Sequence, residues 1–373
     1  MRLSSIELLQ NHNRQRAKSR AGSSIEDEEE ITYGTEKRQS TERKNRDRPG
    51  ALALWLVAIR PQTLPASLSP VVVGSALAIA DYGWNMVRLR EAIAFWMFAL
   101  FIQIGTNLHN DYADFIKGAD TAERLGQARV TQKGWTSPRE MATGATVALL
   151  AALLVGVRLM RRGGWPMFWV VLTSEFNAVA YTGGPFPLGL LHRRLGDFSI
   201  GYLGLGDLFV LLYFGFVAVG GTYYLASVER AMPLHVLGAA APVGFMATAI
   251  IVVNNLRDRK TDVKAGKLTM AVRFGATFAR MEYTVLVLGS FAALSARDAT
   301  VLLSSPRPPA AEMWWRALPY LTLPLAVDRV RRIWTLDGRD LNPLLGSTAK
   351  LQLIFCLCFT AAIVLSSPAS TSK

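Results

Sequence analysis

Long apolar runs alternate along this chain with short polar loops that are rich in Lys and Arg. A helix needs roughly 20 apolar residues to cross the hydrocarbon core of a bilayer. Because runs of about this length recur, they predict an all-α, polytopic membrane protein, a bundle of nine transmembrane helices. The predicted spans are 53–80, 92–111, 139–158, 165–182, 207–227, 235–256, 282–297, 313–328 and 349–367. Prolines at 61, 65 and 70 predict a kinked or partly re-entrant first span.

Composition agrees with this pattern. With 51% hydrophobic residues and a mean hydropathy of +0.23, the 373-residue chain is too apolar for an ordinary soluble protein. The basic residues behind its net charge of +13 lie between apolar runs and form no continuous basic face. The lipid bilayer is therefore the expected partner, and nucleic acid is not. The two cysteines share one apolar run and the four histidines show no metal or haem spacing, which argues against a disulfide framework, a zinc site or a redox centre.

The sequence divides into three segments. Residues 1–50 form a polar tail with basic clusters and the acidic run EDEEE (Glu26–Glu30), and this composition predicts disorder. The tail is a candidate targeting segment, although organelle-targeting segments are normally poor in acidic residues. Residues 51–367 form the predicted transmembrane domain, and 368–373 form a short C-terminal tail.

Loop charge predicts the orientation. Nine crossings place the N-terminal tail and the loops after the second, fourth, sixth and eighth helices on one side, and these loops hold most of the basic residues. By the positive-inside rule this side is cytoplasmic, or stromal in an organelle. The expected location is a plastid membrane in a eukaryote or the plasma membrane in a bacterium.

Two similar acidic clusters emerge on that side. After the second span, Asn107, Asp111 and Asp114 stand at i, i+4 and i+7 on one helical face. After the sixth span, one face of that helix again carries an amide, Asn254, and two carboxylates, Asp258 and Asp262. A second amide, Asn255, lies one step round the helix. The two clusters resemble a direct internal repeat, whereas the inverted repeats of transporters would place equivalent elements on opposite sides.

Four carboxylates that face one another require a counter-charge. Two of them at about 4 Å would repel by on the order of 4 kcal/mol at an effective dielectric near 20. Mg²⁺ is the expected cofactor, because it binds carboxylates together with phosphate oxygens. Basic residues around the same mouth suit a diphosphate: Lys117, Arg129, Lys260, Lys264 and Lys267. Next to an apolar, aromatic-containing bundle, such a site predicts an isoprenoid diphosphate as substrate.

Other interpretations remain open at this point. Each cluster alone is equally typical of solvated loop charge. Arg60 could extend to the membrane interface, and Tyr181 could be an interfacial aromatic before a Gly/Pro turn. A transporter would bury its ionisable groups near mid-membrane, and a CDP-alcohol transferase would use a tight Asp- and Gly-rich motif that is not found here.

Motifs over roughly residues 54–365 resemble the UbiA superfamily of intramembrane aromatic prenyltransferases. They are IRPQTLPASLSPVVVGSALA, QIGTNLHNDYADFIKGADTAERLG, RVTQKGWTSPREM, YTGGPFPLG, YLGLGDLFV, ATAIIVVNNLRDRKTDVKAGKLTMAVRFG and LNPLLGSTAKLQL. The paired Asp motifs identify the superfamily. NDYADFIKGAD, YTGGP and AGKLTMAVRFG resemble the branch that prenylates 1,4-dihydroxy-2-naphthoate for menaquinone or phylloquinone. The resemblance implies a nine-helix bundle around a lateral, lipid-accessible cavity.

The resemblance also implies residue roles. The Mg²⁺ and catalytic residues would be Asp111, Asp114, Asp258 and Asp262, with Asn110 as a further ligand, and the substrate-binding residues Asn107, Asn110, Arg60, Lys117, Arg129, Tyr181, Asn254, Asn255, Lys264 and Lys267. Mg²⁺ and the basic residues would stabilise the departing diphosphate, and the naphthoate would attack the allylic cation and then lose CO₂. Acceptors such as 4-hydroxybenzoate, homogentisate or chlorophyllide stay open as alternatives.

The chain departs from the superfamily pattern at two places. Many members carry a further Asp four residues after Asp114, where this chain has Gly118, and its nearest acid is Asp120. The segment LLHRRLGDFSIG, residues 190–201, interrupts what the family would read as PLGYLGLGD. A gene-model artefact, a surface loop and a specificity element are the three explanations.

Overall fold

The computed structural model describes residues 48–120, 125–127, 129–184, 199–304 and 310–367. The chain divides into two compact units, Met1–Leu54 and Trp55–Lys373, and the architecture below is that of the second unit. The predicted disorder of the tail, the 190–198 part of the interrupting segment and the C-terminal tail lie outside the described residues.

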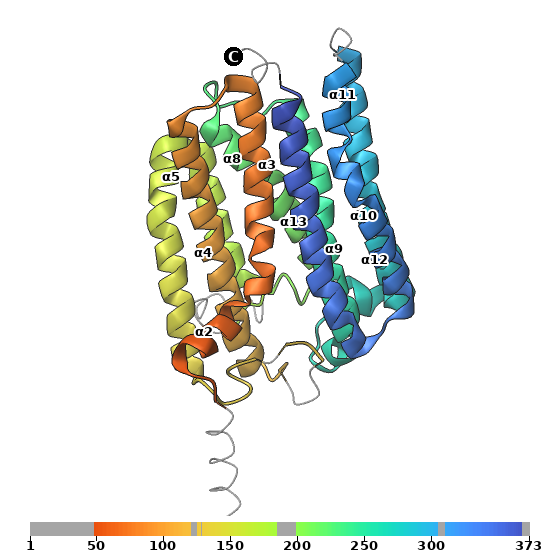
Figure 1. Ribbon diagram of the computed structural model, residues 1–373. Helices are drawn as coiled ribbons and strands as arrows, with labels where there is room; N and C mark the ends of the chain where they lie inside the picture. Colours follow the sequence, from red (N-terminus) through yellow and green to blue (C-terminus); the bar gives the residue numbers. More distant parts are fainter. Residues whose placement is uncertain (1–47, 121–124, 128, 185–198, 305–309, 368–373) are drawn as a thin grey trace, which may run out of the picture. The chain divides into compact units, whose positions relative to one another are not determined.

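All regular elements among the described residues are helical. They are α2 (Ala51–Ile59), η1 (Pro61–Thr63), α3 (Pro65–Tyr82), α4 (Met86–Ile116), α5 (Pro138–Ala180), α7 (Gly206–Val210), the π-helix η2 (Leu211–Val217), α8 (Ala218–Ala226), α9 (Leu234–Lys264), α10 (Met270–Ser304), α11 (Ala310–Arg316), η3 (Leu318–Thr322), α12 (Leu323–Thr335), η4 (Gly338–Asp340) and α13 (Leu341–Leu365) (Figure 1). The all-α prediction is confirmed.

Helix α5 contains two of the predicted spans. It begins with a capping box in which Ser137 and Glu140 each accept from the other's backbone N–H, and it is interrupted at Gly164 (φ 64°, ψ −150°). A Cβ added at Gly156 would lie 2.7 Å from Cγ1 of Val171. These positions would be about 22 Å apart in an unbroken helix. The chain therefore folds back at Gly164, and the two halves of α5 pack as an antiparallel hairpin.

Five helical segments of the described chain are long and apolar enough to cross a membrane: α4, α5, α7 to α8, α9, and η4 to α13. The segment from α2 to α3 qualifies as one further, bent span. Its break lies where prolines predict one, next to Arg60, which adopts left-handed φ and ψ of 55° and 67°. The predicted spans at 282–297 and 313–328 are helical but fail the criterion, and α12 carries four charged residues, 328, 329, 331 and 332. The count of nine spans thus stays a prediction.

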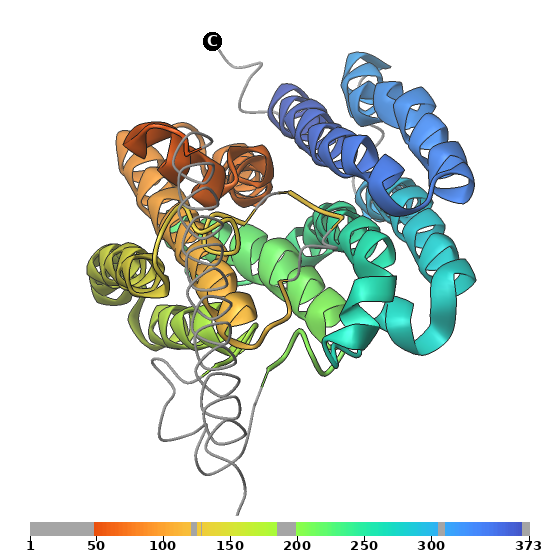
Figure 2. The same ribbon diagram turned by 90° about the horizontal axis from the view of Figure 1, so that it is seen from below.

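The core of the second unit follows α9. Tyr283 of α10, Phe355 of α13 and Val73 of α3 are buried in one apolar cluster with Met246 of α9. A second cluster joins α4, α5 and α8 around Phe95, Phe98 and Met167. Figure 2 shows α3 to α5 on one side and α10 to α13 on the other, with the green helices α7 to α9 between them.

The loops that carry polar motifs meet at one end of this bundle. The N–H of Leu268, after α9, donates to the carbonyl of Tyr202, before α7, at 2.9 Å. The side chain of Asn342, at the start of α13, donates to the carbonyl of Leu125, after α4, at 2.9 Å. Segments that follow the second, fourth, sixth and eighth predicted spans are therefore neighbours, in agreement with the parity of the predicted crossings.

Candidate active site

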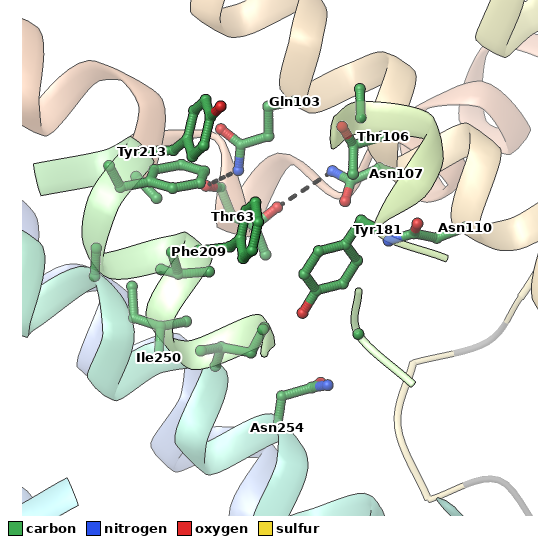
Figure 3. Close-up of a pocket in the computed structure, with 18 of the residues that line it drawn as sticks. Thr63, Gln103, Thr106, Asn107, Asn110, Tyr181, Phe209, Tyr213, Ile250 and Asn254 are labelled. Atoms are coloured by element: carbon green, nitrogen blue, oxygen red, sulfur yellow. Dashed lines mark hydrogen bonds between the residues drawn. The ribbon is translucent and has the colours of Figure 1, made fainter. Parts of the chain in front are cut away.

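A cavity of about 380 Å³ lies between the ends of α4 and α9, the start of α3 and the segment from Gly201 to Ala218. Figure 3 shows Tyr181 in this cavity, between Asn110 of α4 and Asn254 of α9, with Phe209 and Tyr213 along the wall. Both acidic clusters contribute to the lining, so the structure brings together residues that are far apart in the sequence.

Helix α4 presents Asn107, Asn110 and Asp114 to the cavity. Their spacing of three and four residues places them on one face. The Asn107 amide donates to the carbonyl of Ile59 at 3.0 Å, which fixes the break before α3 against α4. Asn110 accepts a hydrogen bond from the hydroxyl of Thr182. The polar end of α4 is thus held by the segments that flank α3 and α5.

Asp114 is contacted by three side chains of this site. It is buried, and Arg129 donates to its Oδ2 at 3.0 Å while the hydroxyl of Tyr202 donates to its Oδ1 at 3.1 Å. Lys267 Nζ lies 3.9 Å from the same Oδ1. A buried carboxylate without such partners would carry a large desolvation cost, so these groups stabilise its charged form.

Asp111 is placed differently from the prediction that it faces the same site. It does not line the cavity, and its two oxygens accept hydrogen bonds from the backbone N–H groups of Val130 and Thr131, both at 3.2 Å. This geometry fixes the loop that carries Arg129. The prediction that Asp111 binds a metal remains untested.

The α9 cluster centres on Arg257. Its guanidinium donates to both oxygens of Asp258, at 2.8 and 2.6 Å, and to Asn254 and Asn342 at 2.6 and 3.0 Å. A Cβ added at Gly126 would lie 2.5 Å from Arg257 Nη2, so the loop after α4 packs directly on this group. Arg257 therefore connects three segments while it neutralises Asp258.

The predicted cations fall into three groups. Arg60, Arg129 and Lys267 line the cavity. Lys117 lies beside it, where it donates to the carbonyl of Thr182 and sits 4.1 Å from the centroid of the Tyr202 ring. Lys264 is exposed and does not line the cavity. Lys264, a predicted substrate-binding residue, is therefore not among the residues that the structure brings together at this cavity.

Tyr181 projects into the cavity from the end of α5. A Cβ at Gly206 would lie 2.8 Å from its hydroxyl oxygen, and one at Gly201 would lie 3.0 Å from its carbonyl. A phenol ionises only at about pH 10, so the Tyr181 hydroxyl carries its proton at neutral pH. It can therefore donate a hydrogen bond to an anion.

The rest of the cavity wall is apolar and aromatic. Phe209 and Tyr213 are stacked, with ring planes 5° apart and centroids 6.1 Å apart. Other apolar lining side chains are Phe95, Phe98, Phe214, Val217, Ile250 and Ile251. The cavity thus joins a charged end to an apolar end, as an amphipathic anion with a hydrocarbon tail requires.

Oxygen donors of the kind that Mg²⁺ prefers line this cavity. Among the described residues, no three His, Cys, Asp or Glu side chains form a group that could hold a metal ion. Mg²⁺ does not need such a cage, because it usually binds one or two carboxylates and completes its shell with water and substrate phosphates. Asp114, Asp258 and Asp262, with the amide oxygen of Asn110, are hard donors around one cavity. They fit Mg²⁺ that arrives with a diphosphate.

Several cavity residues were missed by the sequence analysis. Asp207 lies in the first turn of α7, within the motif YLGLGDLFV, and accepts a hydrogen bond from the Asn255 amide at 3.2 Å. Gln103 lines the cavity one turn before Asn107, and its Nε2 donates to the carbonyl of Thr63 at 2.6 Å. Its position at i−4 from Asn107 was the available signal.

Comparison with known proteins gives consistent results. Residues 67–354 match the UbiA prenyltransferase family. The 1,4-dihydroxy-2-naphthoate octaprenyltransferase of Escherichia coli (strain K12) is 32% identical over 314 residues, which cover 84% of this chain and 95% of that protein. A UbiA homolog from Aeropyrum pernix K1 superposes with a TM-score of 0.58 at 17% identity, over 80% of this chain and 97% of that one. A UbiA homolog from Archaeoglobus fulgidus bound to GPP and Mg²⁺ superposes with a TM-score of 0.51 at 18% identity, over 83% and 99%.

Helices long and apolar enough to cross a membrane, around a cavity that is charged at one end and apolar at the other, suit an intramembrane enzyme that acts on amphipathic substrates. The chain belongs to the UbiA prenyltransferase family. The sequence-based prediction of this superfamily is confirmed, and the protein is an integral membrane prenyltransferase.

Proposed function

We propose that the protein transfers a polyprenyl or phytyl group from its diphosphate to 1,4-dihydroxy-2-naphthoate with loss of CO₂, in menaquinone or phylloquinone biosynthesis. The observation that carries this proposal is the single cavity in which Asp114, Asp258 and Lys267 adjoin an aromatic wall. The name and 32% identity of the Escherichia coli relative support the naphthoate as acceptor.

The charged end would bind the diphosphate. Arg129 and Lys267 are held beside Asp114, so their positive charge is already positioned at the cavity mouth. Asp114, Asp258, Asp262 and Asn110 would hold Mg²⁺, which would supply further positive charge to the departing diphosphate. The protonated hydroxyl of Tyr181 would donate to a diphosphate oxygen as negative charge develops there.

The apolar end would hold the prenyl chain and the acceptor. The ring faces of Phe209 and Tyr213 would stabilise the allylic cation that forms when the bond from C1 to oxygen breaks. The carbon of the naphthoate that bears the carboxylate attacks C1, and loss of CO₂ then restores the aromatic ring. The buried Oε1 of Gln103 has no hydrogen-bond partner among the described residues, so it can accept from a hydroxyl of the naphthoate.

We further propose the membrane orientation. The charged end would face the cytoplasm of a bacterium, with the protein in the plasma membrane, or the stroma of a plastid, because the basic loops gather at this end. The tail of residues 1–50 would then be a targeting segment outside the transmembrane domain of residues 51–367.

The test is a transfer assay with membranes that contain the full chain. Mg²⁺, a prenyl diphosphate and one acceptor at a time are added, and the products are identified by mass. We expect a decarboxylated prenyl product from 1,4-dihydroxy-2-naphthoate. If only 4-hydroxybenzoate, homogentisate or chlorophyllide were prenylated, the family assignment would stand and the acceptor assignment would be wrong.

A further inference from the structure

A second cavity, of about 150 Å³, is lined by residues of the last turns of α3 and α13, the first turn of α9, and α10 and α11. These helix ends lie at the end of the bundle opposite the C-terminal end of α4 (Figure 1). On α3, Asp81 of this cavity lies about 22 Å along the helix axis from Ala66 of the first cavity. The two cavities are therefore separate sites near opposite faces of the membrane.

Two arginines line this second cavity. The side chain of Arg297 is 10% exposed, and its Nη1 donates to Asp298 Oδ1 at 3.0 Å. Arg316 reaches the same oxygen from α11, with its Nη1 at 3.5 Å. The Nε groups of both arginines are buried without a hydrogen-bond partner among the described residues. Two guanidinium groups therefore share one carboxylate oxygen and retain unused donors.

The other carboxylate of the cavity is already engaged. Asp81 accepts a hydrogen bond from the hydroxyl of Tyr223 at 2.6 Å, and its Oδ2 lies 3.0 Å from Nε2 of His235. Asp81 also attracts Arg297 electrostatically, so the described lining balances two arginines with two carboxylates. What remains unsatisfied is the buried Nε–H group of each arginine, which is costly unless a further acceptor reaches it.

We propose that this cavity binds a phosphate group, carried by a lipid headgroup or as free phosphate. Guanidinium groups present several N–H donors in a plane that matches phosphate oxygens. Exposed tryptophans at this end, Trp84, Trp314 and Trp315, mark the depth at which headgroups lie. Leu77, Leu294 and Phe359 form an apolar part of the wall that offers a phosphate no donors. The phosphate would therefore bind beside Arg297 and Arg316.

The experiment measures the melting temperature of the purified full-length protein in detergent. Phosphatidylglycerol, phosphatidylcholine and inorganic phosphate are titrated separately into wild type, Arg297→Gln, Arg316→Gln and Asp298→Asn. The matched control is Arg161→Gln, an exposed arginine outside this cavity, next to the Gly164 turn. We expect saturable stabilisation of wild type by at least one phosphate compound, weakened about tenfold or more in both arginine variants.

Asp298→Asn should have the opposite effect. It removes the carboxylate that competes for the guanidinium groups, so the phosphate compound should bind more tightly than it does to wild type. This opposite sign separates a binding site from general damage to folding, and Arg297→Lys replaces Arg297→Gln if the latter does not fold. Saturation by a phospholipid alone would identify the headgroup as the source, and saturation by inorganic phosphate would identify the free ion. Responses that are equal in wild type and all variants would overturn the proposal.

Discussion

The hydroxyl of Tyr202 donates a hydrogen bond of 3.1 Å to Asp114, from a ring that also lies close to two ammonium groups. Lys117 Nζ lies 4.1 Å and Lys267 Nζ 5.1 Å from the ring centroid. One aromatic ring thus positions two cations beside one carboxylate. This arrangement separates the role of the ring from that of its hydroxyl, and a pair of substitutions can distinguish them.

Tyr202→Phe keeps the ring and removes one hydrogen bond, so turnover should fall by less than about tenfold. Tyr202→Leu also removes the cation–π contacts, so the KM for the prenyl diphosphate should rise clearly more than in Tyr202→Phe. Steady-state kinetics with varied prenyl diphosphate measure both. Equal KM values for the two variants would show that the ring does not position the lysines.

Asp114→Ala and Asp258→Ala should each lower turnover by about a hundredfold or more, which is the scale of losing one preorganised electrostatic group. Asp337→Ala is the matched control, because Asp337 is an exposed acid at the same end that pairs only loosely with Lys260, at 3.8 Å. Prenyl transfer per amount of membrane-inserted protein is the measurement. If both variants kept near-normal activity that EDTA did not abolish, the carboxylates would have no catalytic role.

Asp111→Asn tests whether this carboxylate holds the loop or a metal. Asn keeps one acceptor for the N–H groups of Val130 and Thr131 and turns an NH₂ group toward the other, so the loop that carries Arg129 should loosen. We expect a higher KM for the prenyl diphosphate and an unchanged half-saturating Mg²⁺ concentration. A rise in the Mg²⁺ requirement would instead support the sequence-based prediction that Asp111 is a ligand.

Gly206→Ala should reduce activity through Tyr181. The new Cβ would lie 2.8 Å from the Tyr181 hydroxyl oxygen, so the ring must move. Tyr181→Phe should also reduce activity, and the double variant should be no worse than the more impaired single variant, since both changes act on one hydroxyl. Gly346→Ala in α13, where nothing lies within 4 Å of the added atom, is the control. Additive losses in the double variant would contradict a shared cause.

Deletion of residues 190–201 should leave turnover largely unchanged. Ile200 and Gly201 donate backbone hydrogen bonds to the carbonyls of Ala180 and Tyr181 at 2.9 and 2.8 Å. The deletion brings Leu188 and Gly189 into sequence before Tyr202, so a glycine again occupies the position beside Tyr181. The same deletion with Gly189→Ala should lose activity, because a Cβ there approaches the Tyr181 carbonyl to 3.0 Å. Loss of activity in the plain deletion would show that the segment has become integral.

The sequence predicted the elements whose signal is local. Apolar runs located the helices, and the helical spacing of Asn107 and Asp114 placed both on the cavity face. The break at Arg60 followed from three prolines. These features depend on residues close in the chain, so one sequence is enough to recover them.

Features that depend on tertiary contacts were not predictable in this way. The spacing of Asp111 also suits the cavity face, but backbone N–H groups of a distant loop hold its carboxylate elsewhere. The contacts of Arg257 reach Asn342 in another helix, so no local pattern revealed its position. Lys264 belongs to a basic run whose members look alike in sequence, and only the fold separates it from Lys267.

The antiparallel hairpin within α5 constrains how the protein enters the bilayer during synthesis. Gly164 is the residue within α5 whose backbone angles are non-helical, so a very short turn joins the two halves. We therefore expect the two halves to enter the bilayer together, with their backbone N–H and C=O groups satisfied within each helix. Arg158 and Arg162 lie just before the turn, and Glu91 of α4 pairs with them at 3.0 and 3.1 Å. We therefore expect α4 and the two halves of α5 to insert as one unit of three helices.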